Sequence, residues 1–216
     1  MNSATTVRIT EIFYSLQGEA RAVGWPTVFV RLTGCPLRCT YCDTAYAFHG
    51  GERRELGQVL EAVAAYGARH VCVTGGEPLA QPGARPLLAQ LCRAGFEVSL
   101  ETSGALSIAD LDPAVSIVMD LKTPGSGESA RNLPENIALL RPQDQVKFVV
   151  TNREDYLWSC AMVREHGLSQ RCEVLFSPSA GQQDPAQLAN WILEDRMPVR
   201  FQVQLHKLLW GDVRGR

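Results

Sequence analysis

Long apolar runs are absent from this sequence, and none approaches the about 18 consecutive residues that a membrane-spanning helix requires. The first fifteen residues, MNSATTVRITEIFYS, also lack the basic segment followed by an apolar segment that is typical of a secretion signal. Internal repeats, low-complexity segments and long linkers are missing as well. We therefore expect a single domain over residues 1–216, located in the cytoplasm and without a membrane partner.

The sequence also has little net charge, with 21 lysine and arginine residues against 23 aspartate and glutamate residues. A net charge of −2 is not the basic balance that is typical of proteins binding phosphate backbones, so we expect no nucleic-acid partner. Hydrophobic residues make up 45% of the 216 positions and charged residues 20%, which is typical of a globular protein with one sizeable core.

Short apolar runs rich in valine, isoleucine and phenylalanine recur along the chain and are typical of buried strands. These runs are PTVFVRLTG, HVCVTGG, FEVSLETSG, VSIVMDLK, DQVKFVV, CEVLFSP and VRFQVQLHK. Between several of them, leucine and alanine recur at intervals of three and four, which predicts helices. The predicted helices are Glu55–Tyr66, Arg85–Ala94, Glu135–Leu140, Arg153–His166 and Pro185–Asp195. This alternation predicts an α/β fold with a parallel sheet, in which the short connection Gly104–Val115 is degraded.

Nearly every predicted strand ends in a polar or glycine-rich tail. The tails are TGC, TGGEP, ETSG, DLKTPGSG, SPSAG and QLHK. Turns need glycine and polar residues after a strand, so a single tail says little about function. Ligands bind beyond the carboxyl ends of the strands in parallel barrels and sheets. Six such tails in succession therefore predict an active site at this edge of the sheet.

Three of the seven cysteines, Cys35, Cys39 and Cys42, lie within eight positions in the stretch TGCPLRCTYCDTAYAF. In a reducing cytoplasm, clustered cysteines indicate metal ligands or catalytic groups before disulfides. A structural zinc needs a fourth ligand, for which His49 and Cys72 are the candidates. Alternatively, the three thiolates hold an iron–sulfur cluster that usually takes four, so that one iron can bind a substrate or cofactor. The spacing alone leaves both possibilities open.

Further motifs extend the cysteine pattern. The cysteine stretch, with Tyr41 at its aromatic position, resembles the Cys-x3-Cys-x-aromatic-Cys loop of radical S-adenosylmethionine (SAM) enzymes. TGGEP, ETSG and DLK at later strand ends are similar to other motifs of that superfamily. The two glycines of TGGEP allow a ligand to approach the backbone closely.

This resemblance implies a shortened, partial (β/α) barrel of the radical SAM type with degraded helices. It also implies a [4Fe–4S] cluster bound by Cys35, Cys39 and Cys42, with SAM at the open iron. The residues that it assigns to SAM binding are Tyr41, Cys42, Asp43, Gly76, Glu77, Ser103, Asp120, Leu121, Lys122, Ser177 and Pro178.

The N-terminal stretch ITEIFYSLQGEA, followed by GWPTVFVRLTGC, resembles the 7-carboxy-7-deazaguanine synthase family. The resemblance implies a short N-terminal substrate-binding extension and a pterin substrate. The substrate-binding residues that it implies are Leu16, Gln17, Gly18, Glu19, Arg31, Thr74 and Arg216. The side-chain chemistry agrees, because Gln17 suits the amide-like edge of a pterin and Glu19 accepts hydrogen bonds from ring N–H or amino groups. Arg31 carries a planar fork that matches a carboxylate.

The same resemblance assigns a Mg²⁺ ion to the hydroxyl that follows the last cluster cysteine, here Thr44. By itself, this threonine is more typical of a turn or a helix N-cap. The chain ends in DVRGR, which departs from the family, so the carboxylate of Arg216 and the side chain of His206 are alternative substrate contacts. The remaining cysteines are interpreted as core or incidental residues, namely Cys72, Cys92, Cys160 and Cys172.

The activity implied by the resemblance is that of a carbon–nitrogen lyase in queuosine and deazapurine biosynthesis. It would convert 6-carboxy-5,6,7,8-tetrahydropterin to 7-carboxy-7-deazaguanine and ammonia, through a radical made from SAM, which is regenerated. The implied partners are an electron donor such as flavodoxin or ferredoxin and a second copy of the chain in a homodimer. Two alternatives stay open: an activating enzyme for glycyl-radical enzymes, which shares the cysteines, GGEP and DLK, and a non-catalytic zinc-binding module.

Overall fold

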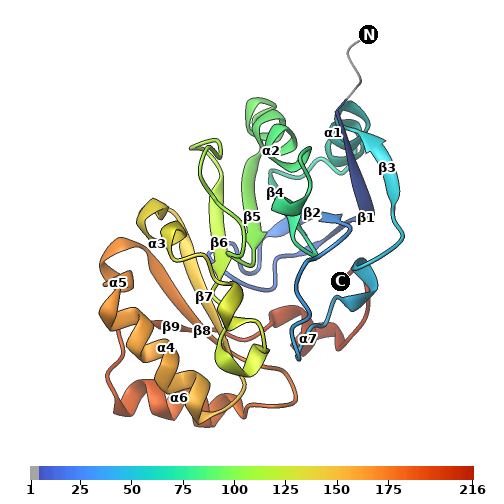
Figure 1. The fold of residues 1–216 in the computed structure, drawn as a ribbon. Helices are drawn as coiled ribbons and strands as arrows, with labels where there is room; N and C mark the ends of the chain where they lie inside the picture. The colour runs from blue at the N-terminus through green and yellow to red at the C-terminus, as the bar shows by residue number, and fades with distance from the viewer. Residues whose placement is uncertain (1–4) are drawn as a thin grey trace.

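The computed structural model describes residues 5–216, in which nine strands form one sheet in the order β3-β1-β2-β4-β5-β6-β7-β8-β9. The first four residues belong to the stretch interpreted above as lacking a secretion signal and lie outside the described residues. All neighbouring strands from β2 to β9 are parallel, whereas β1 pairs antiparallel with both β2 and β3. Figure 1 shows a curved sheet that does not close, with β3 and β1 at one end and β9 at the other.

From β4 to α6, most strands and helices alternate along the chain, as the sequence predicted. The strands are β1 (Thr6–Leu16), β2 (Pro26–Leu32), β3 (Glu52–Glu55), β4 (His70–Gly75), β5 (Glu97–Thr102), β6 (Ser116–Asp120), β7 (Gln145–Val150), β8 (Glu173–Pro178) and β9 (Arg200–Phe201). The helices are α1 (Leu56–Ala64), α2 (Ala84–Arg93), α3 (Glu135–Leu139), α4 (Arg153–Glu165), α5 (Leu168–Arg171), α6 (Pro185–Glu194) and α7 (Leu205–Trp210). Among the helices of the described range, none has the length and apolar character needed to span a membrane.

The predicted helices are present, and the connection from Gly104 to Val115 contains no helix, as expected. The prediction of one long strand over VRFQVQLHK is wrong, because only Arg200–Phe201 is a strand and α7 follows it. The N–H of Gln202 still donates to the carbonyl oxygen of Phe176 on β8, at 3.0 Å. The N–H of Leu205 then donates to Gly18 O at 3.0 Å, so the N-terminal loop takes over from the sheet as hydrogen-bond partner.

Alternation along the parallel strands separates the hydrophobic core from the polar face of the sheet. On β6, Ile117 and Met119 are buried in the main core, which also contains residues of α1, α2, α4 and α6. Their neighbours Val118 and Asp120 face the other side, where Val118 packs with Leu175 of β8. In Figure 1 helices α1 to α6 lie along the outer side of the curved sheet. The inner side is therefore left for polar side chains at the carboxyl ends of the strands.

The N-terminal stretch predicted as a substrate-binding extension is an integral part of the sheet. β1 pairs with β2 from Ile9 to Leu16 and with β3 from Thr6 to Ile9. Val7 and Ile9 are buried in the main core, which anchors the strand. Because β1 ends at Leu16, the sheet delivers the following residues, Gln17 to Glu19, to its polar face.

Candidate active site

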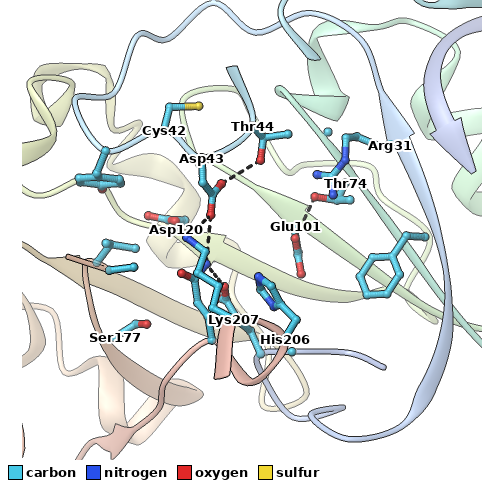
Figure 2. A pocket seen from close by; sticks show the side chains of 18 of the residues that line it. Arg31, Cys42, Asp43, Thr44, Thr74, Glu101, Asp120, Ser177, His206 and Lys207 are labelled. Atoms are coloured by element: carbon cyan, nitrogen blue, oxygen red, sulfur yellow. Dashed lines mark hydrogen bonds and ion pairs between the residues drawn. The ribbon is translucent and has the colours of Figure 1, made fainter. Parts of the chain in front are cut away.

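The polar strand tails line one cavity of about 520 Å³ at the carboxyl edge of the sheet. Side chains of β2 and β4 to β8 form its floor, and the cysteine loop, the N-terminal segment 16–19 and the C-terminal segment complete the wall. Figure 2 shows Arg31 and Glu101 from the strands together with Cys42 from the loop and His206 from α7. The predicted convergence of the strand tails is confirmed.

Cys35, Cys39 and Cys42 lie in the loop between β2 and the short 3-10 turn Ala45–Ala47, and all three line the cavity. Their thiols are half-buried and free of disulfides. Burial raises the pKa of Cys39 to about 11 and also raises the pKa of Cys35. Because metals bind thiolates, ligation at this loop has to displace protons from these two thiols.

The two candidates for a fourth zinc ligand lie elsewhere. Cys72 is fully buried within β4, and neither Cys72 nor His49 lines the cavity. In residues 5–216, no three His, Cys, Asp or Glu side chains converge closely enough to hold a single metal ion. Thiolates that bind separate irons of a cluster lie further apart than ligands of one ion. Three thiols on one loop beside a wide cavity therefore fit a cluster better than zinc.

Gly75 and Gly76 bring the end of β4 against the cysteine loop. A Cβ atom at Gly75 would overlap the carbonyl oxygen of Leu32, and one at Gly76 would overlap the carbonyl group of Gly34. The same Cβ at Gly76 would also lie 2.8 Å from the Cβ atom of Cys35. Gly75 is therefore needed for close packing against the end of β2, and Gly76 for close packing against the loop that carries the thiols.

Glu77, predicted to contact SAM, has a fully buried side chain outside the cavity wall. Its carboxylate accepts hydrogen bonds from Thr102 Oγ1 at 2.9 Å, Ser103 N at 2.7 Å and Ser103 Oγ at 2.5 Å. The Glu77 side chain therefore supports Ser103, which does line the cavity, and the predicted contact of the GGEP backbone with SAM stays a prediction.

Asp120 and Lys122 of the DLK motif face the cavity as an ion pair with 3.1 Å between Oδ1 and Nζ. Strand alternation places Leu121 on the opposite side, where it is 1% exposed in the main core. The Leu121 side chain is therefore not available to SAM, and the predicted SAM contact of Leu121 stays a prediction for its backbone. The other residues assigned to SAM all line the cavity, namely Tyr41, Cys42, Asp43, Gly76, Ser103, Asp120, Lys122, Ser177 and Pro178.

Glu101 of β5 joins two of the predicted substrate-binding residues. Thr74 Oγ1 donates to its Oε2 at 2.8 Å, and Gln17 Nε2 donates to its Oε1 at 3.3 Å. All three side chains line the cavity, together with Leu16 and Gly18. Glu101 was not among the predicted site residues, although it begins the ETSG motif at a strand end, and this position was the signal that could have identified it.

Glu19 is bound by a lysine that was also missed. Lys147 Nζ lies 2.7 Å from Glu19 Oε2 and 3.5 Å from Asp120 Oδ2. Gln204 Nε2 donates to Glu19 Oε1 at 2.8 Å. Lys147 interrupts the apolar strand QVKFVV in the same way that Arg31 interrupts VFVRLTG, so the sequence carried the same signal for both residues.

Arg31 lies in the cavity wall, and Glu11 of β1 holds it there. Its Nε donates to Glu11 Oε1 at 2.7 Å, and its guanidinium lies 5.6 Å and 5.8 Å from the ring centroids of Phe13 and Tyr46. Tyr46 OH donates to the same oxygen at 2.7 Å, and Arg214 Nε lies 3.3 Å from Oε2. Burial opposes ionisation of Glu11, but these hydrogen bonds and the nearby arginines lower its pKa.

Thr44, the predicted Mg²⁺ ligand, donates its hydroxyl to Asp43 Oδ1 at 2.8 Å. Asp43 Oδ2 lies 3.1 Å from Lys207 Nζ and accepts from Gln204 Nε2 at 3.2 Å. Figure 2 shows Asp43 between Thr44 and Lys207. Burial opposes ionisation of Asp43, but Lys207 and these hydrogen bonds hold its pKa far below the usual range. Thr44 precedes the turn Ala45–Ala47 without a side-chain capping bond, so a cap does not account for its hydroxyl.

Both C-terminal candidates for substrate contact reach the cavity. His206 of α7 lies against Gly18, where an added Cβ would overlap its Nδ1. Arg216 also lines the cavity, and its guanidinium lies 5.9 Å from the ring centroid of Trp210. The remaining cysteines do not line the cavity, namely Cys72, Cys92, Cys160 and Cys172.

Comparison with known proteins agrees with this geometry. The family model of the radical SAM superfamily matches residues 29–175. A 7-carboxy-7-deazaguanine synthase from Chlorobaculum tepidum is 44% identical over an alignment that covers 100% of both chains. The chain belongs to the 7-carboxy-7-deazaguanine synthase family. Another member of this family, from Methanospirillum hungatei, is 40% identical over 94% of this chain and 85% of its own length.

The fold of this family is also seen in a solved structure, the crystal structure of QueE from Escherichia coli. It matches with a TM-score of 0.76 at 22% identity and covers 93% of this chain and 95% of the other. The predicted partial barrel is thereby confirmed. The cofactors of the family are a [4Fe–4S] cluster, SAM and Mg²⁺. The three cavity-lining thiols, the crowded glycines of TGGEP and the Asp43–Thr44 pair fit these groups.

Proposed function

We propose that this protein is a carbon–nitrogen lyase that converts 6-carboxy-5,6,7,8-tetrahydropterin to 7-carboxy-7-deazaguanine with release of ammonia. The observation that carries the proposal is the single cavity in which residues 16–19 and Arg31 lie beside Cys35, Cys39 and Cys42. The names of the relatives support the same activity. The product is a precursor of queuosine and other 7-deazapurines.

The substrate is bound at both ends in this proposal. Because Nε of Arg31 is held by Glu11, its two terminal nitrogens are the pair that forks to the substrate carboxylate. Glu19 and Glu101 present carboxylate oxygens to the ring N–H and amino groups, and Gln17 supplies an amide for the carbonyl edge. Contacts at two ends fix the position of the ring, which is the main contribution that the protein makes to the rate.

When bound, the cluster and SAM supply a 5′-deoxyadenosyl radical that takes a hydrogen atom from the substrate. Cys35, Cys39 and Cys42 are the proposed cluster ligands. The protein then has to hold SAM by its polar groups and exclude water. Gly76 offers backbone without a side chain, and Ser103 and Asp120 offer polar groups that Glu77 and Lys122 hold in place. Further proposed SAM contacts are Tyr41, Cys42, Asp43, Lys122, Ser177 and Pro178.

The proposed Mg²⁺ ligand is the hydroxyl of Thr44, with substrate oxygens and waters completing the shell. Asp43 accepts a hydrogen bond from the hydroxyl of Thr44, and Lys207 keeps Asp43 ionised. An ionised acceptor orients the hydroxyl oxygen so that a lone pair is free for the cation. We also propose that Leu16, Gly18, Thr74 and Arg216 complete the substrate-binding wall.

One anaerobic assay tests this function. The reconstituted protein is incubated with the carboxypterin, SAM, Mg²⁺ and a chemical reductant, and the products are read by mass spectrometry. We expect 7-carboxy-7-deazaguanine to form with SAM regenerated rather than consumed. An activating enzyme for a glycyl-radical enzyme would cleave SAM without stimulation by the carboxypterin, and that result would overturn the proposal.

We further propose that the protein works as a homodimer. The C-terminal region exposes apolar side chains, with Leu208 71%, Leu209 51% and Val213 56% exposed. Contiguous exposed apolar residues are typical of protein contacts, which supports an interface between copies here. Light scattering after size exclusion should give the mass of two chains for the wild type and of one chain for Leu208→Glu. A monomeric wild type would contradict the proposal.

The electron donor and the compartment are proposed on chemical grounds. A cluster bound by free thiolates needs a reducing compartment, which supports the cytoplasm. A small redox protein such as flavodoxin or ferredoxin is the proposed electron donor. Replacing the chemical reductant by each reduced carrier in the product assay should support turnover with at least one of them. Cell fractionation should recover the protein with cytoplasmic markers.

A further inference from the structure

Lys147 occupies a central position between the substrate-binding and SAM-binding sides of the cavity. It extends from β7 toward Asp120, its register partner on β6, and toward Glu19 of the N-terminal segment. Its Nζ lies 2.7 Å from Glu19 Oε2 and 3.5 Å from Asp120 Oδ2. The three side chains are largely buried, with 13%, 12% and 16% of Lys147, Glu19 and Asp120 exposed. Charges in such a place need a partner, because burial makes an unpaired charge costly.

The two carboxylates differ in how strongly they depend on Lys147. Asp120 has a second lysine, because Lys122 Nζ lies 3.1 Å from its Oδ1. Glu19 has no second cation among its described contacts, and its other partners are the neutral amides of Gln204 at 2.8 Å and Gln202 at 3.4 Å. Removal of Lys147 therefore leaves Asp120 paired and leaves Glu19 as a buried carboxylate without a counter-charge.

We propose that Lys147 is a positioning residue that keeps Glu19 ionised and directed into the cavity as an acceptor for the substrate. The proposal rests on the function proposed above, in which Glu19 accepts hydrogen bonds from the ring. An ionised carboxylate only accepts hydrogen bonds, whereas a protonated one carries a donor on one oxygen. A ring edge that presents N–H groups is matched by the ionised form and is opposed by the donor of the protonated form.

The surrounding charges agree with this assignment. Burial alone would lower the pKa of Lys147, but the carboxylates of Glu19 and Asp120 raise it well above its usual value. Lys147 is therefore a fixed positive charge at neutral pH. The other charged or titratable groups that line the cavity around this pair are Arg31, Cys35, Cys39, Tyr41, Cys42, Asp43, Tyr46, Glu101, Asp120, Lys122, His206, Lys207, Asp212, Arg214 and Arg216. Two lysines among these already pair with other carboxylates, Lys122 with Asp120 and Lys207 with Asp43.

The test measures carboxypterin binding to the anaerobic holoenzyme with SAM present, by calorimetry between about pH 6 and 8, where a buried carboxyl without a cation takes up a proton. The wild type should bind the carboxypterin without proton release at the lower pH. Lys147→Met should release about one proton per substrate bound at the lower pH, because binding requires the ionised carboxylate. Its dissociation constant, divided by that of the wild type, should rise up to about tenfold for each pH unit of acidification.

Matched variants separate positioning from a general structural effect. Lys147→Arg keeps the charge, so its dissociation constant divided by that of the wild type should not change with pH. Glu19→Gln/Lys147→Met removes both charges, and it should bind weakly but without the pH dependence or the proton release. Lys122→Met is the reciprocal variant and should weaken SAM binding more than carboxypterin binding. Lys147→Gln provides a second neutral substitution if Lys147→Met does not fold, as judged by the cluster spectrum and thermal unfolding.

The outcomes distinguish this proposal from the proposed function. A wild type that does not bind the carboxypterin contradicts the function itself. If the wild type binds and the neutral Lys147 variants show a dissociation constant, relative to the wild type, that does not change with pH, only the role of Lys147 is overturned. The same pH dependence in the double variant as in Lys147→Met would show that another group titrates and would also overturn it.

Discussion

The strand-borne and loop-borne side chains of the site differ in what holds them in place. Asp120 and Lys147 are register partners on neighbouring parallel strands, and both form ion pairs with other protein groups. Cys39, Thr44 and Arg214 lie on the cysteine loop and the C-terminal tail, outside any strand. Backbone hydrogen bonds of the sheet position the first group, whereas individual loop and side-chain contacts position the second.

This difference predicts three kinds of failure. A change on a strand leaves the fold intact and exposes an uncompensated charge in a largely buried place, so the loss falls on one ligand. A change in the cysteine loop removes a proposed ligand of the cofactor on which all chemistry depends. A change in the exposed tail removes a contact that water replaces at small cost. Four substitutions test this comparison, and they follow here in order of decreasing effect.

The largest effect is expected in the cysteine loop. Cys39→Ala removes one of three thiolates, and we expect loss of the cluster and of all SAM cleavage. Iron content and the visible spectrum of the anaerobically reconstituted protein measure the cluster, and chromatography of SAM products measures SAM cleavage. Cys92→Ala, outside the cavity, serves as control and should retain both. Full cluster content in Cys39→Ala would contradict the ligand assignment.

The next effect belongs to a strand. Arg31→Ala removes the proposed partner of the substrate carboxylate, which costs on the order of 2–5 kcal/mol for a buried charged contact. This corresponds to roughly 30-fold to several-thousand-fold weaker carboxypterin binding, measured by anaerobic calorimetry with SAM present. Arg31→Lys keeps the charge but loses the planar pair of donor nitrogens, so its carboxypterin affinity should fall between those of the wild type and Arg31→Ala. SAM binding should stay near that of the wild type, and unchanged carboxypterin affinity in Arg31→Ala would make Arg31 a scaffold residue.

A smaller effect is expected at Thr44, whose hydroxyl is proposed as one Mg²⁺ ligand among several. Thr44→Ala should weaken the dependence on Mg²⁺ and raise the KM for the carboxypterin by roughly tenfold, the order expected for one hydrogen bond or ligand contact to a charged group. The KM for SAM should change less. Thr44→Ser keeps the hydroxyl and should behave like the wild type. A Mg²⁺ titration that is identical in Thr44→Ala and the wild type would reduce Thr44 to a turn residue.

The smallest effect is expected in the C-terminal tail. Arg214 is 56% exposed at its side chain, and its ion pair with Glu11 lies at 3.3 Å. Exposed ion pairs contribute about 0.2–1 kcal/mol, so Arg214→Ala should weaken carboxypterin binding by no more than about fivefold. Glu11→Gln should cost more, because it also removes the charge that holds Arg31. A larger loss in Arg214→Ala than in Glu11→Gln would show that the tail contacts the substrate directly.

Local pattern was sufficient for much of the fold and for the cofactor loop. Short apolar runs rich in valine, isoleucine and phenylalanine predicted β4 to β8, and leucine and alanine spacing predicted the helices that cover them. Cys35, Cys39 and Cys42 are close in the sequence, so their shared place in one loop needed no knowledge of the fold. The glycines of TGGEP were predicted to allow a ligand to approach the backbone, whereas the structure shows that the carbonyl groups of Leu32 and Gly34 already leave no room for a Cβ atom there.

Contacts between distant segments could not be read in the same way. The prediction of one long strand over VRFQVQLHK was wrong because the chain leaves β8 after Gln202. It then forms its next hydrogen bond with Gly18, and α7 begins. Leu121 was assigned to SAM as part of a motif, and only the structure shows that its side chain turns into the core, which leaves its backbone for the predicted contact. The side-chain partners of Glu77 were likewise not predictable, because Thr102 and Ser103 lie on another strand end.

The sequence by itself determined the strand and helix alternation, the position of the site at the carboxyl edge and the three thiols, because each depends on residues that are near neighbours in the chain. Only the tertiary structure decided that Glu19 meets Lys147, 128 positions away, and that Glu11 meets Arg214, 203 positions away. These pairings depend on the order and register of the strands and on the path of the tail. Sheet order is set by the packing of the whole core, which no short segment encodes.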